Sequence, residues 1–194
     1  MNKHLAVRVS ELTQVLENLE DACSETLEEV VDTIINAFEN QKKVLICGNG
    51  GSAADSQHFA AEFVSAFSRD IERRALPAMA LTVDTSILTA YSNDFNFENV
   101  FQRQVEAYGN KGDVLIVLTT SGSSRNCIAA AKRSTELGLR TIAFTSAGGE
   151  ISNFVENSLE IPSQNTQHIQ ECHIFLYHLI VELVENKMFR SKLK

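Results

Sequence analysis

The chain has 194 residues, 44% of them hydrophobic and 22% charged, which suits one compact domain (residues 1–194) with a sizeable core. Its formal net charge of −8 argues against a broad basic surface for nucleic acids, although a local basic patch could still bind a sugar phosphate. The four cysteines form no CxxC pair, the first residues lack a long apolar run, and no window approaches the roughly 18 apolar residues of a membrane span. We therefore expect a cytoplasmic protein with reduced thiols, no membrane segment and no nucleic-acid partner.

The first 40 residues carry apolar side chains at helical spacing. From Leu5 to Phe38 these side chains recur three or four residues apart. The spacing predicts two N-terminal helices, which precede an α/β core and a C-terminal helix in residues 41–194. The apolar positions are Leu12, Val15, Leu16 and Leu19, followed by Leu27, Val30, Val31, Ile34 and Ile35.

Five short apolar runs then alternate with helical or turn segments: KVLICG, AMALTV, DVLIVLTT, RTIAFT and SLEIP. This alternation predicts an α/β fold with a five-stranded parallel sheet flanked by helices. The runs are continuously apolar, as expected where helices cover both faces of a sheet. Residues 166–189 have the spacing of one long C-terminal helix.

Polar loops follow two of these strands. The first, Gly48 to Ser52 (GNGGS), has glycines that permit positive φ, and Ser52 can cap the next helix. The second, Thr119 to Ser124 (TTSGSS), precedes a helix predicted from Asn126 to Leu137, whose N-terminus favours an anion. Ligands of open parallel sheets bind at the carboxyl ends of the strands, so we expect both loops to line one crevice. Neither loop matches a Walker A or GxGxxG pattern, so a monophosphate fits better than a nucleotide; two ordinary capped turns are the alternative.

His58 and Glu62 lie four residues apart, on one face of the helix predicted after the first loop. Both side chains can therefore point into the crevice as a general base and its neighbour, or they are a solvated glutamate and a core histidine. The last helix also contains polar side chains within an apolar stripe, and such groups need partners. They are His168, Gln170, Glu171, His173 and His178.

Four motifs give the chain a family resemblance over nearly its whole length: CGNGGSAADSQHFAAE, LTVDTSILTAYSNDF, TSGSS and IQECHIFLYH. With these motifs the chain resembles the phosphoheptose isomerases of the sugar isomerase (SIS) fold. The resemblance implies a flavodoxin-like SIS domain that assembles as a homotetramer with active sites at subunit interfaces. It also implies an aldose–ketose isomerase that converts sedoheptulose 7-phosphate to D-glycero-D-manno-heptose 7-phosphate, for heptose-containing surface polysaccharides such as lipopolysaccharide.

The resemblance also implies roles for single residues. Glu62 matches the catalytic base and His178 its acid/base partner. An enediol reaction needs a carboxylate near the carbon and an acid or metal at the oxygens, which agrees with these roles. The implied zinc ligands are His58, Glu62, Gln170 and His178, one ion per active site. The implied substrate contacts are Asn49, Gly50, Gly51, Glu62, Asn93, Asp94, Thr119, Thr120, Ser121, Ser124 and Gln170.

The sequence departs from the family pattern at two places. His168 stands where many relatives have arginine before the IQE motif, and Ala66-Phe67 stands where many have Gly-Arg. A short insertion at residues 69–74 accompanies the second change. These differences could move the positive charge that meets a sugar phosphate, so we expect Arg69 or a neighbour to replace it.

The spacing of Gln170 and His178 bears on how such a site is completed. On one unbroken helix, the Cα atoms of two residues that are eight positions apart lie about 12 Å from each other. A zinc ion needs each donor atom within about 2.0–2.2 Å of itself. One helix could supply both residues only with side chains stretched toward each other. The easier solutions are a helix that begins after Gln170, or two chains that each supply one residue.

Two other functions remain open from the sequence. One is the isomerisation of a different sugar phosphate. The other is a non-catalytic SIS protein that binds a replication initiator and has the same fold and loops. That class lacks residues matching Glu62 and His178, and this chain has both.

Overall fold

The centre of the structure is one parallel sheet. The computed structural model describes residues 3–190, and its strands lie in the order β2-β1-β3-β4-β5. The predicted five-stranded parallel sheet is therefore confirmed. The strands are β1 (Val44–Gly48), β2 (Ala78–Ala80), β3 (Val114–Thr119), β4 (Arg140–Ser146) and β5 (Asn157–Ile161).

The run AMALTV forms a shorter strand than predicted. Only Ala78–Ala80 belongs to β2, an edge strand that pairs with β1 alone. The chain turns away from the sheet at Leu81 and Thr82, where Thr82 Oγ1 donates a hydrogen bond to the carbonyl of Ala53, 3.1 Å away. That bond connects the end of the strand to the neighbouring helix.

The helices include the two predicted N-terminal helices and the predicted long C-terminal one. They are α1 (Lys3–Glu17), α2 (Leu19–Glu39), α3 (Gly51–Val64), α4 (Thr85–Asp94), α5 (Val100–Tyr108), α6 (Arg125–Leu137) and α7 (Thr166–Phe189), with 3-10 turns η1 (Phe97–Asn99) and η2 (Glu150–Phe154). No described helix is both long and apolar enough to cross a bilayer.

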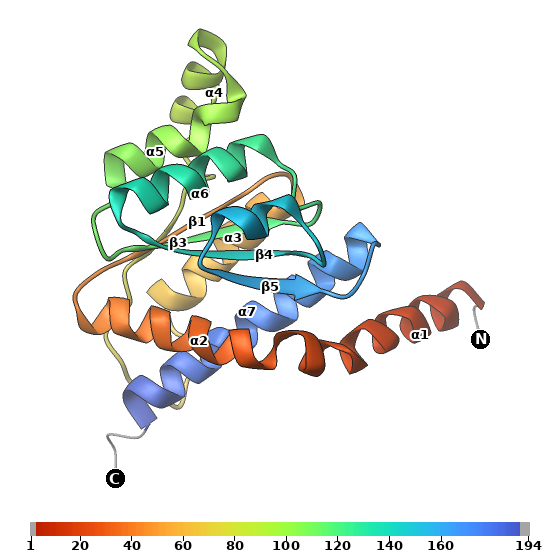
Figure 1. Cartoon of the computed structure of the whole chain (residues 1–194). Helices are drawn as coiled ribbons and strands as arrows, with labels where there is room; N and C mark the ends of the chain where they lie inside the picture. The colour runs from red at the N-terminus through yellow and green to blue at the C-terminus, as the bar shows by residue number, and fades with distance from the viewer. Residues whose placement is uncertain (1–2, 191–194) are drawn as a thin grey trace.

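The helices cover the sheet from both sides, as the continuous apolar strands predict (Figure 1). On one face, Ile46 of β1 belongs to a core with Phe59 of α3 and Tyr177 of α7, to which α2 also contributes. On the other face, Leu45 belongs to a core with α5 and α6. Consequently α3 and α7 lie on the same side of the sheet, and α5 and α6 lie on the other.

Two helices extend away from this layered core. In Figure 1, α1 runs outward beyond α2, and α4 projects beyond α5, on the side of the sheet remote from α7. Leu5, Val7 and Val9 of α1 are 60%, 53% and 57% exposed, and Val15 is the one buried residue within α1. Both helices thus present surface that the core of this chain does not cover.

Candidate active site

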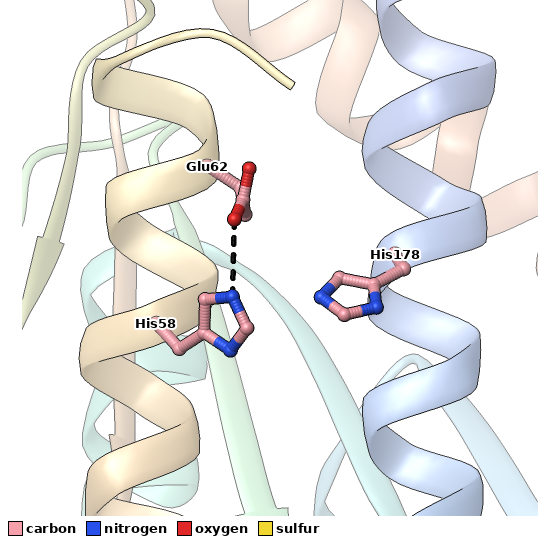
Figure 2. A group of neighbouring side chains, drawn as sticks. All are labelled: His58, Glu62 and His178. Carbon is pink, nitrogen blue, oxygen red and sulfur yellow. Dashed lines mark hydrogen bonds and ion pairs between the residues drawn. The ribbon is translucent and has the colours of Figure 1, made fainter. Parts of the chain in front are cut away.

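A cluster of three side chains bridges α3 and α7. His58 and Glu62 of α3 and His178 of α7 each offer one ligand atom, and these atoms all lie within 4.8 Å of one another. His58 Nε2 lies 3.0 Å from Glu62 Oε1, and the imidazole of His178 faces both residues from the neighbouring helix (Figure 2). We call this group the His–Glu–His cluster. Within the described part of the chain, it is the one group of three or more His, Cys, Asp or Glu side chains arranged to hold a metal.

Glycines at the end of β1 allow α3 to pack closely against α7. Gly50 has φ +57° and stands at the N-cap of α3, so Ser52 lies within the helix and does not cap it as the sequence suggested. A Cβ atom on Gly51 would lie 2.4 Å from Nε2 of Gln170. A side chain at position 51 would therefore displace Gln170 of α7.

Burial and neighbouring charges set the protonation of His178. Burial is the main cause that lowers the pKa of His178 below its usual value; nearby His58 acts in the same direction and Glu62 opposes it. A lowered pKa keeps His178 neutral at neutral pH, with one nitrogen that donates and one that accepts. His178 can therefore exchange protons with substrate oxygens or ligate a metal.

Tyr177 orients His58 from within the core. Its Oη lies 2.8 Å from Nδ1 of His58, so the two ring nitrogens of His58 face Tyr177 and Glu62. Burial raises the pKa of Tyr177 well above its usual value, and the charges of Asp55 and Glu62 act in the same direction. Tyr177 thus remains a neutral hydroxyl that can donate or accept.

Gln170 lies on the same unbroken helix as His178. Helix α7 begins at Thr166, so a helix that begins after Gln170 is wrong as an explanation of the eight-residue spacing. Within this chain the Gln170 amide donates to Asp55 Oδ2 at 2.6 Å, instead of joining the His–Glu–His cluster. Burial is the main cause that raises the pKa of Asp55, while the Gln170 hydrogen bond acts in the opposite direction.

The donor set of the cluster fits zinc. Two imidazole nitrogens and one carboxylate oxygen are the three protein ligands of many catalytic zinc sites, in which a further position stays open. His58, Glu62 and His178 would hold the ion, and their donor atoms already face one space. Bound there, zinc would polarise substrate oxygens.

The two polar loops lie at the same edge of the sheet, as the sequence predicts for the ends of adjacent parallel strands. Gly48 of β1 is in register with Leu118 of β3. Asn49 and Asn126 exchange two side-chain hydrogen bonds of 2.8 Å, which join the loop after β1 to the start of α6. A single edge of the sheet therefore carries both loops.

The hydroxyl loop is partly organised by its own hydrogen bonds. Thr119 is buried and its Oγ1 donates to Ser124 Oγ at 3.2 Å, while Thr120 is half-buried. Ser121 is exposed and accepts from the backbone N–H of Ser123 at 3.3 Å. Ser121 and Ser123 are thus exposed beside the N-terminus of α6, where an anion is favoured.

Asn93 and Asp94 are not brought to the cluster of their own chain. They lie at the exposed end of α4, which projects from the opposite side of the sheet from α7 (Figure 1). Asn93 Nδ2 donates to Asp94 Oδ1 at 2.9 Å.

The arginines of the insertion take different positions. Arg69 is exposed, whereas Arg74 donates to the carbonyl of Phe38 and Arg73 is buried against Glu185. Of the arginines at positions 69–74, only Arg69 is thus left to meet a phosphate. His168, which replaces a family arginine, is buried with Nε2 3.8 Å from Glu11 Oε2 of α1.

Sequence reasoning missed four residues around the cluster: Tyr177, Asp55 and the two members of the Arg73–Glu185 ion pair. Tyr177 sits next to His178 within an apolar stripe, where a tyrosine is expected to be core. Asp55 lies three residues before His58, so helical periodicity could have placed it near the cluster.

Comparison with known proteins identifies the family of the chain. The SIS domain family matches residues 9–146. A phosphoheptose isomerase of Clostridium acetobutylicum is 50% identical over 169 residues, 87% of this chain and 85% of the relative. One from Aquifex aeolicus is 53% identical over 158 residues, 81% of this chain and 82% of the relative. The solved phosphoheptose isomerase of Neisseria gonorrhoeae has a TM-score of 0.89 and 38% identity, covering 95% of this chain and 98% of its own.

The chain therefore belongs to the SIS-domain proteins. Within them it belongs to the phosphoheptose isomerase family.

Proposed function

We propose that the protein is an aldose–ketose isomerase that converts sedoheptulose 7-phosphate to D-glycero-D-manno-heptose 7-phosphate. The observation that carries the proposal is the position of Glu62 and His178, which face one space from adjacent helices. Relatives that are about half identical and cover most of this chain are named for this reaction class. A non-catalytic binding role would leave the facing carboxylate and imidazole without a purpose.

The reaction transfers one proton between neighbouring carbons. Glu62 removes the proton from C1 of the ketose, which gives an enediol, and returns a proton to C2. His178 donates a proton to the oxygen on C2 and accepts one from the oxygen on C1, so the protons balance. A neutral imidazole suits this exchange, and burial lowers the pKa of His178 in the required direction.

The two loops would bind the rest of the sugar phosphate. Thr119, Thr120, Ser121 and Ser124 would meet the phosphate beside the start of α6, and Asn49, Gly50 and Gly51 would line the adjoining wall. Helix N-termini and hydroxyls are suited to a phosphate group.

Zinc would be held by His58, Glu62 and His178, with Gln170 as a further ligand after its side chain leaves Asp55. The support is the donor set and the proximity of the three donor atoms. The ion would polarise the sugar oxygens, while the proton transfers stay with Glu62 and His178.

A homotetramer would complete the site. The proposal is supported by the projecting helices α1 and α4, which carry exposed apolar residues and two of the expected substrate contacts. In such an assembly, Asn93 and Asp94 of one subunit would reach the cluster of another. We further propose that the enzyme works in the cytoplasm, where sugar phosphates are made, and serves surface heptose synthesis.

The experiment is an isomerase assay on a panel of pentose, hexose and heptose phosphates, followed by NMR in deuterated water. We expect exchange and interconversion of sedoheptulose 7-phosphate at a kcat/KM at least tenfold above every other sugar. Preference for a pentose or hexose phosphate would support the alternative substrate. If none of the sugar phosphates is interconverted, the proposed isomerase activity is excluded.

A further inference from the structure

An ion pair is buried next to the site but outside it. Arg73 and Glu185 have side chains that are each 1% exposed, and Arg73 Nε lies 2.5 Å from Glu185 Oε1. A buried pair of this kind is costly to desolvate unless further hydrogen bonds satisfy the remaining donors and acceptors. The partners of those remaining atoms therefore indicate what the pair holds together.

Arg73 uses its remaining donors on the end of α3. Nη2 donates to the carbonyl of Glu62 and Nη1 to that of Phe63, both at 2.9 Å. These carbonyls belong to the last turn of α3, which ends at Val64, where helical partners run out. One planar guanidinium thus fixes the backbone of the proposed base itself.

Glu185 uses its other contacts on the chain that leaves α3. Its Oε1 accepts from the backbone N–H of Phe67 at 2.9 Å, and its Oε2 accepts from that of Ser68 at 3.0 Å. Residues 65–77 contain no helix or strand, and these two bonds hold the start of that segment against α7. The carboxylate therefore connects α7 to both the exit and Arg73.

Glu185 also lies seven residues after His178, which is close to two helical turns and nearly the same face of α7. A continuous path runs from the Glu62 carbonyl through Arg73 and Glu185 to the helix that carries His178. We propose that the Arg73–Glu185 pair is a positioning device that sets the distance between Glu62 and His178 for proton transfer. This inference rests on the proposed isomerase function.

The pair should affect turnover more than substrate affinity. Its contacts reach the backbone of Glu62 and the helix α7, which carries His178. The hydroxyl loop lies near the other end of α3, beside β3 and α6. A small displacement between reacting groups lowers the rate of chemistry strongly, even where the substrate still binds.

The test is Arg73→Lys, which keeps the positive charge but loses the fork that reaches four acceptors. The matched control is Arg74→Lys, because Arg74 donates to Phe38 on α2, away from Glu62 and His178. For Arg73→Lys we expect kcat to fall at least tenfold with KM within twofold of wild type. Arg74→Lys should leave both constants within twofold.

Lost stability has to be separated from lost positioning. Leu159→Ala, at a buried position of the edge strand β5, should lower the melting temperature without touching the pair, and it should keep a near wild-type kcat below its own melting temperature. If Arg73→Lys does not fold, Glu185→Gln is the second variant, because its amide keeps the shape of the carboxylate. A folded variant of either kind with unchanged kcat overturns the proposal.

A second measurement separates this proposal from the proposed function. Co²⁺ bound by the His–Glu–His cluster would absorb visible light, so titration with Co²⁺ reports on the cluster. His178→Ala, which lacks one ligand, serves as the blank. We expect Arg73→Lys to weaken Co²⁺ binding at least tenfold and to alter the absorption spectrum. If wild type isomerises no sugar, the proposed function fails and the Co²⁺ result alone decides. Unchanged Co²⁺ affinity and spectrum would then overturn the positioning role.

Discussion

Tyr177 and His58 form a hydrogen bond across the interface of α3 and α7, with Oη 2.8 Å from Nδ1. Because the tyrosine stays protonated, it can donate to Nδ1, and Nε2 of His58 then carries the ring proton and donates to the Glu62 carboxylate. If Nε2 binds a metal, the ring proton has to be on Nδ1. The tyrosine oxygen can then accept a hydrogen bond from Nδ1–H. One hydroxyl therefore supports both forms of the ring.

Tyr177→Phe should weaken zinc binding by about 10- to 100-fold, the usual cost of losing the group that orients a histidine ligand. The ring should remain in place, because it stacks on Phe59 at a centroid distance of 4.9 Å. Competition with a chromophoric chelator measures the affinity, and Tyr91→Phe on α4 is the control. Equal zinc affinity in wild type and Tyr177→Phe would show that the hydroxyl does not orient a ligand.

Glu62→Gln should keep the fold and lose turnover, because an amide of nearly the same shape cannot take a carbon-bound proton. Circular dichroism checks the fold, and NMR with sedoheptulose 7-phosphate measures the rate. The control is Glu182→Gln, at an exposed position of α7, and this variant should remain active. Full activity of Glu62→Gln would exclude Glu62 as the base, and loss of folding would indicate a structural role.

Ser121→Ala and Ser124→Ala should each weaken sugar-phosphate binding. A hydrogen bond to a charged group contributes about 1.5–3 kcal/mol, so dissociation constants should rise about 10- to 150-fold. Calorimetry with the sugar phosphate and with inorganic phosphate gives the affinities, with Ser152→Ala, at a half-buried position of η2, as a control for the substitution itself. Wild-type affinity of both loop variants for both ligands would place the phosphate elsewhere.

Mixed subunits test how the site is shared. Glu62 and His178 already face each other within one chain, so mixing Glu62→Gln subunits with His178→Ala subunits should restore no activity. Mixing Glu62→Gln subunits with subunits that carry Asn93→Ala and Asp94→Ala should restore activity, because α4 is remote from its own cluster. Subunit exchange is verified by native mass spectrometry. Activity in the first mixture, or none in the second, would contradict this division of the site.

His173 should make the protein less stable in weak acid. It is 0% exposed, and burial, as the main cause, lowers its pKa to about 3. Because the unfolded chain takes up the proton near pH 6.5, the folded state loses stability as the pH falls from about 6.5 toward 3. The loss attributable to His173 at pH 5 is about 2 kcal/mol.

Urea unfolding of wild type and His173→Phe at pH 7 and pH 5 measures this effect. The variant should lose about 2 kcal/mol less than wild type between the two pH values, whatever its stability at pH 7. Equal losses would mean that His173 titrates normally.

The sequence predicts those parts of the molecule that depend on local patterns. Continuous apolar runs predict the buried parallel strands, and the i, i+4 spacing correctly predicts that His58 and Glu62 share a helix face. The predicted length of β2 was too long: the strand ends at Ala80, and Thr82 bonds to α3 where the chain leaves the sheet. Local propensity cannot reveal a bond to another helix.

The contacts that arrange the site could not be predicted, because they join distant segments. Arg73 lies in an insertion that suggested phosphate contact, yet it folds beneath the end of α3 and pairs with Glu185, 112 residues away. Tyr177 has the spacing of a core residue, and only the packing of α7 on α3 makes it a partner of His58. Sequence alone gives no register for that packing.

The hydrogen bond between Tyr177 and His58 joins residues 119 positions apart, so α7, the last helix of the chain, has to dock before the cluster exists. Contacts this distant in sequence form slowly, because a long loop must close before they gain any energy. During synthesis on the ribosome, β1, β3 and α3 emerge long before α7, and the nascent chain therefore carries Glu62 without its partner. Chemical competence arises only when the final helix has been released and packed, which makes recovered turnover a specific reporter of the completed fold.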